Sequence, residues 1–248
     1  MNVDHDALML VAVAGVAFVG SVVGGVTGYG TGLLLQPVLA PVIGVVAVVP
    51  VMSVAMAFTN ASRIWVYRRE IDRRVVRLTA PLALLGTAIG AWVYVQLSEA
   101  VIALALGCFL LLAVPLQRHS KARQFALGDA GLAASAFGYG LLAGGMSGTG
   151  LLFIVALRAA GVGGGALIAT DASVAVTLGL LKTAIFWRNG LLDSSLLLAG
   201  LAIGLCAFPG AFVARAAMNR LALHHHDRIM EAVIVLGGFS LIWKGMSL

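Results

Sequence analysis

Long apolar runs, separated by short polar or charged breaks, fill almost the whole chain. They cover about residues 7–26, 31–44, 45–61, 78–95 and 99–116 in the first half, and about 130–146, 151–160, 166–187, 191–214 and 229–243 in the second. A transmembrane helix needs about 20 predominantly apolar residues. The pattern predicts an all-α polytopic membrane protein with about eight full transmembrane helices. Short broken or re-entrant helices would bring the elements up to about ten.

The composition agrees with this class. Hydrophobic residues make up 61% of the 248 residues and charged residues only 10%, against about 25% charged residues in soluble domains. No soluble domain is expected. The net charge of +6 is interpreted as basic loops that fix membrane orientation, and not as nucleic-acid binding. Residues 1–6 lack the basic region of a secretory signal, so we expect the first apolar run to be retained.

The two halves of the chain, 1–123 and 124–248, share short segments in the same order. The matching pairs are 24–28 with 144–148, 31–34 with 149–152, 53–55 with 173–175, 86–90 with 200–204, and 99–102 with 231–234. One match could be chance in so apolar a sequence. The repeated order indicates a duplication, so each half is predicted to be one transmembrane repeat.

The distribution of charge predicts that the repeats are inverted. Loops 63–77 and 117–127 are basic, as cytoplasmic loops are. In the second half, loop 188–194 corresponds to 63–77 but carries little charge, whereas 215–228 corresponds to the neutral joint at 96–98 and is basic. The three basic loops are therefore predicted to be cytoplasmic and both termini to lie outside. Inverted repeats with glycine-interrupted segments point to a secondary transporter.

Two glycine-rich stretches, 24–32 and 144–150, interrupt the apolar runs. Glycine costs about 1 kcal/mol relative to alanine inside a helix, and non-helical backbone at membrane depth survives only inside protein or beside a water-filled cavity. The helix that restarts exposes N–H groups and a partial positive charge, which attract anions. Two such breaks, from inverted halves, would hold a small anion. The candidate binding residues are Thr27, Gly28, Gly30, Thr31, Gly32, Ser147, Gly148, Thr149 and Gly150.

Helix packing is the alternative interpretation, because glycine, serine and threonine are common at transmembrane interfaces. We favour packing for the scattered residues Gly86, Gly90, Gly200 and Gly204. We favour a binding site for the two clusters, because hydroxyl side chains accompany them and both precede short segments.

The duplicated pattern Gly-Gly-x-Thr/Ser-Gly followed by Thr-Gly-Leu-Leu resembles the sulfite exporter TauE/SafE family, which is also described as a toluene-sulfonate uptake permease family. The stretch 187–193 resembles that family too, and the likeness covers essentially the whole chain. It implies transport of sulfite, organosulfonates or related sulfur-containing anions, and we expect the protein to lie in the plasma (bacterial inner) membrane. The chain departs from the pattern at Tyr29 and Gly30, which are extra in the first copy, at Pro37 and at Asp171. These departures leave the substrate open.

Several polar residues fall within the apolar runs. Asp171 could couple transport to a proton or sodium ion, or it could cap a helix or pair with a cation. Lys182 could offset the charge of a substrate or reach the membrane interface, and Arg158 is expected to stabilise a helix C-terminus or reach a headgroup. Candidates for supporting polar contacts around the site are Gln36, Ser53, Asn60 and Ser173.

Other functions are weighed against the transporter. The alternatives are an anion channel and a carrier of a non-sulfur anion such as a carboxylate. An intramembrane enzyme would have to use the cluster at 224–227, which is instead interpreted as a solvated loop because adjacent histidines on a helix point apart. Cys108 and Cys206 lie in apolar runs and are interpreted as neither disulfide nor metal ligand. We expect no enzyme activity, metal or cofactor; the sequence leaves the oligomeric state open.

Overall fold

The computed structural model describes the backbone of residues 3–27, 30–120, 126–217 and 224–247, and side chains within 12–27, 30–115, 126–216 and 234–247. Every regular element in these ranges is a helix. The helices are α1 (Val3–Thr27), α2 (Thr31–Ile43), α3 (Val45–Tyr67), α4 (Arg73–Gln96), α5 (Glu99–Ser120), α6 (Asp129–Gly145), α7 (Gly150–Ala159), α8 (Gly164–Arg188), α9 (Ser194–Ala207), α10 (Gly210–Ala217) and α11 (His224–Met246).

Four stretches among the described residues are long and apolar enough to cross a membrane. They are Val45–Tyr67, Arg73–Gln96, Gly164–Arg188 and Ser194–Ala216. The helical, membrane-type fold is confirmed, but the predicted count of about eight full spans is not. The two segments after the glycine breaks are short, at 13 residues for α2 and 10 for α7, so neither reaches the length of a full span.

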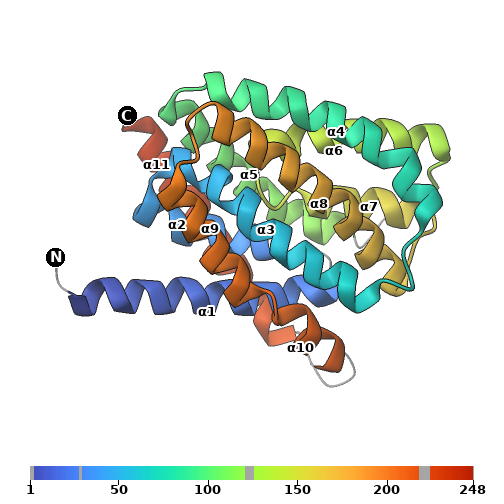
Figure 1. Cartoon of the computed structure of the whole chain (residues 1–248), viewed down its shortest axis with the longest axis horizontal. Coiled ribbons are helices and arrows are strands. Elements are labelled where there is room, and N and C mark those ends of the chain that lie inside the picture. Colours follow the sequence, from blue (N-terminus) through green and yellow to red (C-terminus); the bar gives the residue numbers. More distant parts are fainter. Residues whose placement is uncertain (1–2, 28–29, 121–125, 218–223, 248) are drawn as a thin grey trace.

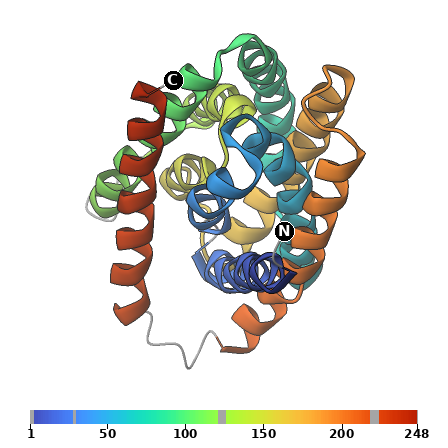
Figure 2. The same cartoon turned by 90° about the vertical axis from the view of Figure 1, so that its left-hand side faces the viewer.

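Helices from the first half of the chain pack against helices from the second half. The α4 helix packs along α6, and α1 packs along α9 and α10. In the same way, α3 contacts α9 and α4 contacts α8. The α3 and α8 helices pack against each other, as do α5 and α11. In Figure 1 the start of α1 and the end of α11 lie at the same end of the bundle. Figure 2 shows α11 (red) on one side of the bundle and α9 (orange) on the other.

The scattered glycines pack helices together, as the sequence predicts. A Cβ added at Gly86 or Gly90 would lie under 3.0 Å from backbone atoms of α6. One added at Gly200 or Gly204 would lie under 3.0 Å from side chains of α3. Close backbone approach through small residues is a common way for membrane helices to associate.

One predicted boundary is wrong, and one predicted span is interrupted. The α3 helix does not end at Ala61 but continues to Tyr67, so the connection to α4 is only residues 68–72 and not 63–77. The predicted span 191–214 corresponds to the candidate span Ser194–Ala216, but its helix is interrupted between α9 and α10, where Pro209 lacks a backbone N–H.

The predicted loop 215–228 is also shorter than expected. Arg215 lies within α10, and the helix α11 begins at His224. The histidine cluster is therefore helical in its backbone, and its side chains lie outside the described residues.

Aspartates begin two of the helices. Asp193 accepts a hydrogen bond from the N–H of Leu196 at the start of α9, and this bond lowers the pKa of the Asp193 carboxyl. The aspartate that ends the stretch 187–193 is therefore a helix cap. Asp72 caps α4, because its Oδ1 accepts hydrogen bonds from the N–H groups of Arg74 and Val75 at 3.0 and 3.1 Å.

We predict that Asp72→Ala destabilises the protein by about 1 kcal/mol, because two N–H groups at the start of α4 lose their acceptor. Thermal unfolding of the purified protein measures the change. Asp72→Asn keeps an acceptor at the same position and is the matched control. Equal losses in both variants would show that the cap contributes nothing.

Candidate functional site

The two glycine breaks meet in the interior of the bundle. A Cβ added at Gly32 would lie 2.5 Å from the amide nitrogen of Gly148 and 2.7 Å from its Cα. Gln36 links the same segments, because its Nε2 donates to the carbonyl of Ser147 at 2.7 Å and to that of Gly32 at 2.9 Å. The first turn of α2 therefore lies directly against the segment that precedes α7.

Backbone conformations available to glycine turn the chain into both short helices. Gly30, before α2, has φ 126°, and Gly148, just before α7, has φ 82°. Neither helix start has a side-chain cap. The first N–H groups of a helix have no partner within the helix, so two sets of backbone donors begin beside each other.

A small cavity of about 60 Å³ adjoins these helix starts. By volume it has room for a few water molecules. Its lining comes from both glycine breaks and from α3, α6 and α8. The lining residues are Gly30, Gly32, Ser53, Met56, Asn60, Arg63, Tyr139, Ala143, Met146, Ser147, Gly148, Thr149, Gly150, Asp171, Ala175, Leu178, Gly179 and Lys182.

Arg63 is the principal candidate residue that the sequence analysis does not identify. The apolar pattern places it in a basic loop, but it lies within α3 and is 1% exposed. Its guanidinium donates to Oγ1 of Thr31 and to Oδ1 of Asn60, each at 3.3 Å. A buried guanidinium beside two helix N-termini makes this side of the cavity electropositive.

A polar face along α3 could have revealed Arg63. Ser53, Met56, Asn60 and Arg63 are spaced by three or four residues, which places them on one face of a helix, and all four line the cavity. An apolar run ends where the first charged residue appears, so hydropathy places Arg63 outside the helix that carries Ser53, Met56 and Asn60.

Two further ionisable side chains line the cavity from α8. Lys182 is 7% exposed and donates to the carbonyl of Ala143 at 2.8 Å and to that of Met146 at 3.5 Å, at the end of α6. It therefore does not reach the membrane interface. Asp171 is 2% exposed and lies two turns inside α8, so it is not a helix cap.

Asp171 is the one carboxylate in the described lining of the cavity. Its Oδ1 has no hydrogen-bond partner among the described residues, and it interacts electrostatically with Arg63. The charged side chains of the lining are thus two cations and one carboxylate. An anion entering the cavity meets a net positive surface when all three are ionised.

The structure divides the predicted site residues into two groups. Those that line the cavity are Gly30, Gly32, Ser147, Gly148, Thr149, Gly150, Asp171, Lys182, Ser53 and Asn60. Thr31 and Gln36 lie behind it and bond its members, while Thr27 and Ser173 bond carbonyls of their own helices. Gly28 lies outside the described residues.

Among the residues whose side chains are described, no group of three or more His, Cys, Asp or Glu could hold a metal ion. The lining of the cavity offers backbone N–H groups, hydroxyl and amide side chains, and the charged side chains Arg63, Asp171 and Lys182. Such a set can bind and release an anion.

A bundle of apolar helices, with a cavity between two short helices that each follow a glycine break, is typical of membrane transporters. The sequence matches the family described as Sulfite exporter TauE/SafE over residues 13–241, and the chain therefore belongs to that family. Neither a curated protein nor a solved structure matches it. The protein is thus an integral membrane transporter of the TauE/SafE family.

Proposed function

We propose that this protein is a secondary transporter that moves a small sulfur-containing oxyanion across the plasma (bacterial inner) membrane by alternating access. The observation that carries the proposal is that the starts of the short helices α2 and α7 meet beside Arg63. Backbone N–H groups at the starts of α2 and α7 would bind the oxyanion, and the guanidinium would neutralise its charge.

The size of the cavity favours a small substrate. A volume of about 60 Å³ suits an anion as compact as sulfite better than an aromatic sulfonate. We therefore place sulfite ahead of the larger organosulfonates. Carboxylates present the same charge to helix N-termini, so only a direct comparison distinguishes them.

The test is calorimetric binding to the purified protein, with sulfite, thiosulfate, sulfoacetate, taurine, acetate and citrate as ligands. We expect sulfite to bind most tightly. Tighter binding of acetate would change the substrate class to carboxylates. Flux into liposomes that does not saturate with substrate, at rates far above carrier turnover, would replace the carrier with an anion channel.

Inverted repeats would supply the two conformations of alternating access. The reciprocal packing of α4 on α6 and of α1 on α9 and α10, and the matching contacts of α3 with α9 and α8 with α4, support a division into 1–123 and 124–248. Under this division α2 and α7 are equivalent elements that enter the site from opposite sides of the membrane. Rocking of one repeat against the other would expose the anion to each side in turn.

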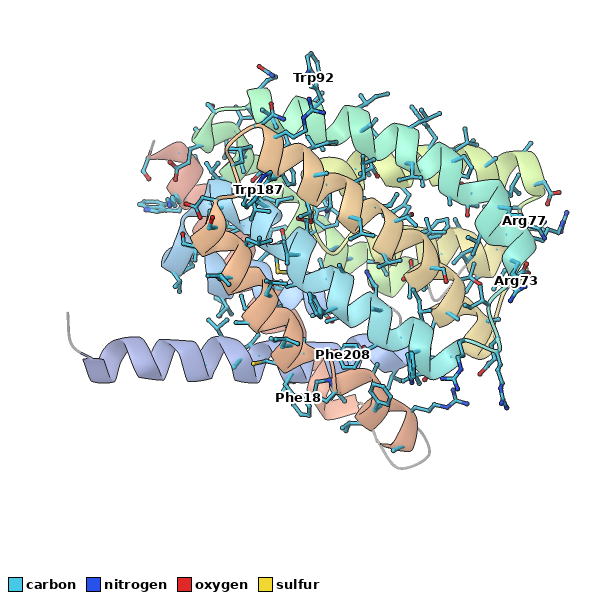
Figure 3. The ribbon with its side chains drawn as sticks, viewed as in Figure 1. Phe18, Arg73, Arg77, Trp92, Trp187 and Phe208 are labelled. Atoms are coloured by element: carbon cyan, nitrogen blue, oxygen red, sulfur yellow. The ribbon has the colours of Figure 1, made fainter. Side chains whose placement is uncertain are left out.

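We also propose that the basic end of the bundle is cytoplasmic. Arg73 and Arg77 project from the end opposite the start of α1 (Figure 3). The connection at 68–72, and with it the segments 117–127 and 215–228 that the sequence predicts to be cytoplasmic, would then face the cytoplasm, and both termini would face outward. Excess arginine on one side is the usual mark of cytoplasmic loops.

We predict that Asp171 couples the transport of the anion to protons. It is buried in the cavity, with Arg63 facing it from α3, Tyr139 from α6 and Lys182 on its own helix. A protonated Asp171 would leave two cations for the anion, whereas an ionised one competes with it. Asp171→Asn should therefore transport without dependence on a pH gradient, as measured by flux into liposomes.

Retention of the wild-type response to a pH gradient in Asp171→Asn would contradict this role. A sodium gradient applied at constant pH distinguishes the second candidate ion. Ser173→Ala, two residues along the same helix and outside the cavity lining, is the control and should keep the wild-type pH response.

A further inference from the structure

A groove separate from the central cavity lies between the end of α3 and α10. It has a volume of about 390 Å³ and is lined by Trp65, Val66, Arg68, Phe212, Arg215 and Ala216. A second groove of about 290 Å³ adjoins it, sharing Val66, Arg68 and Arg215 and adding Tyr67, Arg69 and Glu70. Together they form one continuous surface, which we call the α3–α10 groove.

Both shared arginines are held in place. The guanidinium of Arg68 stacks over the ring of Trp65 at 5.1 Å and donates to the carbonyl of the same residue at 3.2 Å. That of Arg215 stacks over Tyr67 at 4.9 Å and donates to the carbonyl of Val66. Because these contacts fix the side chains, less conformational entropy is lost when a ligand binds them.

The arginines retain capacity for an anion. A guanidinium has five N–H donors, and the hydrogen bonds to Trp65 and Val66 occupy one donor of each arginine. Glu70 is the one acid in the described lining; its Oε1 lies 3.9 Å from Nη2 of Arg215, too far for a hydrogen bond. Three arginines against one glutamate leave the groove with a net charge of +2.

Apolar side chains flank the cationic centre. Trp65 is 63% exposed and Phe212 is 40% exposed. Exposed tryptophan near the end of a membrane helix is typical of the interface between lipid headgroups and acyl chains. The groove thus offers cations for a phosphate and rings for the hydrocarbon attached to it.

We propose that the α3–α10 groove binds the phosphate headgroup of an anionic phospholipid. Arg68 and Arg215 bind the phosphate through charge-assisted hydrogen bonds, and Trp65 and Phe212 pack against the glycerol and the first acyl carbons. The site is independent of the anion cavity, since the described lining of the two shares no residue.

The test is native mass spectrometry of the purified full-length protein with phosphatidylglycerol or phosphatidylcholine. We expect phosphatidylglycerol to bind, and Arg68→Gln/Arg215→Gln to weaken its binding by about 10-fold. The control is Arg73→Gln/Arg77→Gln, which removes the same charge from the start of α4, outside the lining of the groove. It should stay within about twofold of wild type.

Equal losses in the two double variants, or equal binding of the two lipids, would overturn the proposal. Inorganic phosphate provides the second arm. If phosphate displaces short-chain phosphatidylglycerol as well as the lipid displaces itself, the groove binds a free anion and the lipid assignment is wrong. Should Arg215→Gln prevent folding, Arg68→Gln alone, with Arg77→Gln as its control, gives the same comparison.

Discussion

Replacing Arg63 by glutamine is expected to weaken sulfite binding by roughly 10- to 100-fold. A hydrogen bond to a charged group contributes about 1.5–3 kcal/mol, and each 1.4 kcal/mol corresponds to about a factor of ten. Arg63 is 1% exposed and lines the cavity, so water screens its charge little. Calorimetric titration of the purified variant with sulfite measures the change.

Two further variants separate binding from folding. Arg63→Lys keeps the charge but not the two bonds to Thr31 and Asn60, so we expect an intermediate affinity. Arg158→Gln removes an exposed cation at the end of α7, away from the cavity, and should bind as the wild type does. Wild-type affinity in a folded Arg63→Gln protein would remove Arg63 from the site.

Replacing Gly32 by alanine is expected to abolish transport and to destabilise the fold by about 1–3 kcal/mol. The added Cβ would lie 2.5 Å from the backbone nitrogen of Gly148, about 1 Å short of an ordinary contact. Backbone on both sides leaves no flexible atom to move, and overpacking of this kind typically costs about 1–3 kcal/mol. Any separation of the two helix starts also misplaces the N–H donors that face the anion.

Gly138→Ala is the matched control, because a Cβ there meets nothing within 4 Å and α6 is a regular helix. It should leave flux unchanged and unfolding unchanged or slightly improved. Flux into liposomes and thermal unfolding measure both variants. Wild-type flux in Gly32→Ala would mean that close contact of the two breaks is not needed.

Local features of the sequence predicted the helices and the two breaks well. Glycine at 30 and 148 permits the positive φ values that turn the chain, and the short runs after them are the short helices α2 and α7. The expectation that the breaks meet rested on the predicted inverted orientation of the two halves and not on any one residue. The structure brings Gly32 and Gly148 together as that reasoning expected.

The errors arose where tertiary contacts outweigh local polarity. A cation at the end of an apolar run usually marks a loop, but Arg63 has polar partners within the protein, one of them Thr31 from another helix. Hydropathy along the chain contains no information about such a partner. The apolar run at 191–214 does correspond to one candidate span, Ser194–Ala216, but hydropathy alone does not show the interruption of its helix at Pro209.

Our central proposal is that an oxyanion binds between the starts of α2 and α7 beside Arg63. Selenite has the shape and charge of sulfite, and its selenium atom can be located by anomalous X-ray scattering from crystals of the protein. We expect a selenium peak in the cavity lined by Gly32, Arg63 and Gly148. A peak elsewhere, or an empty cavity in crystals of a protein that transports selenite, would contradict it.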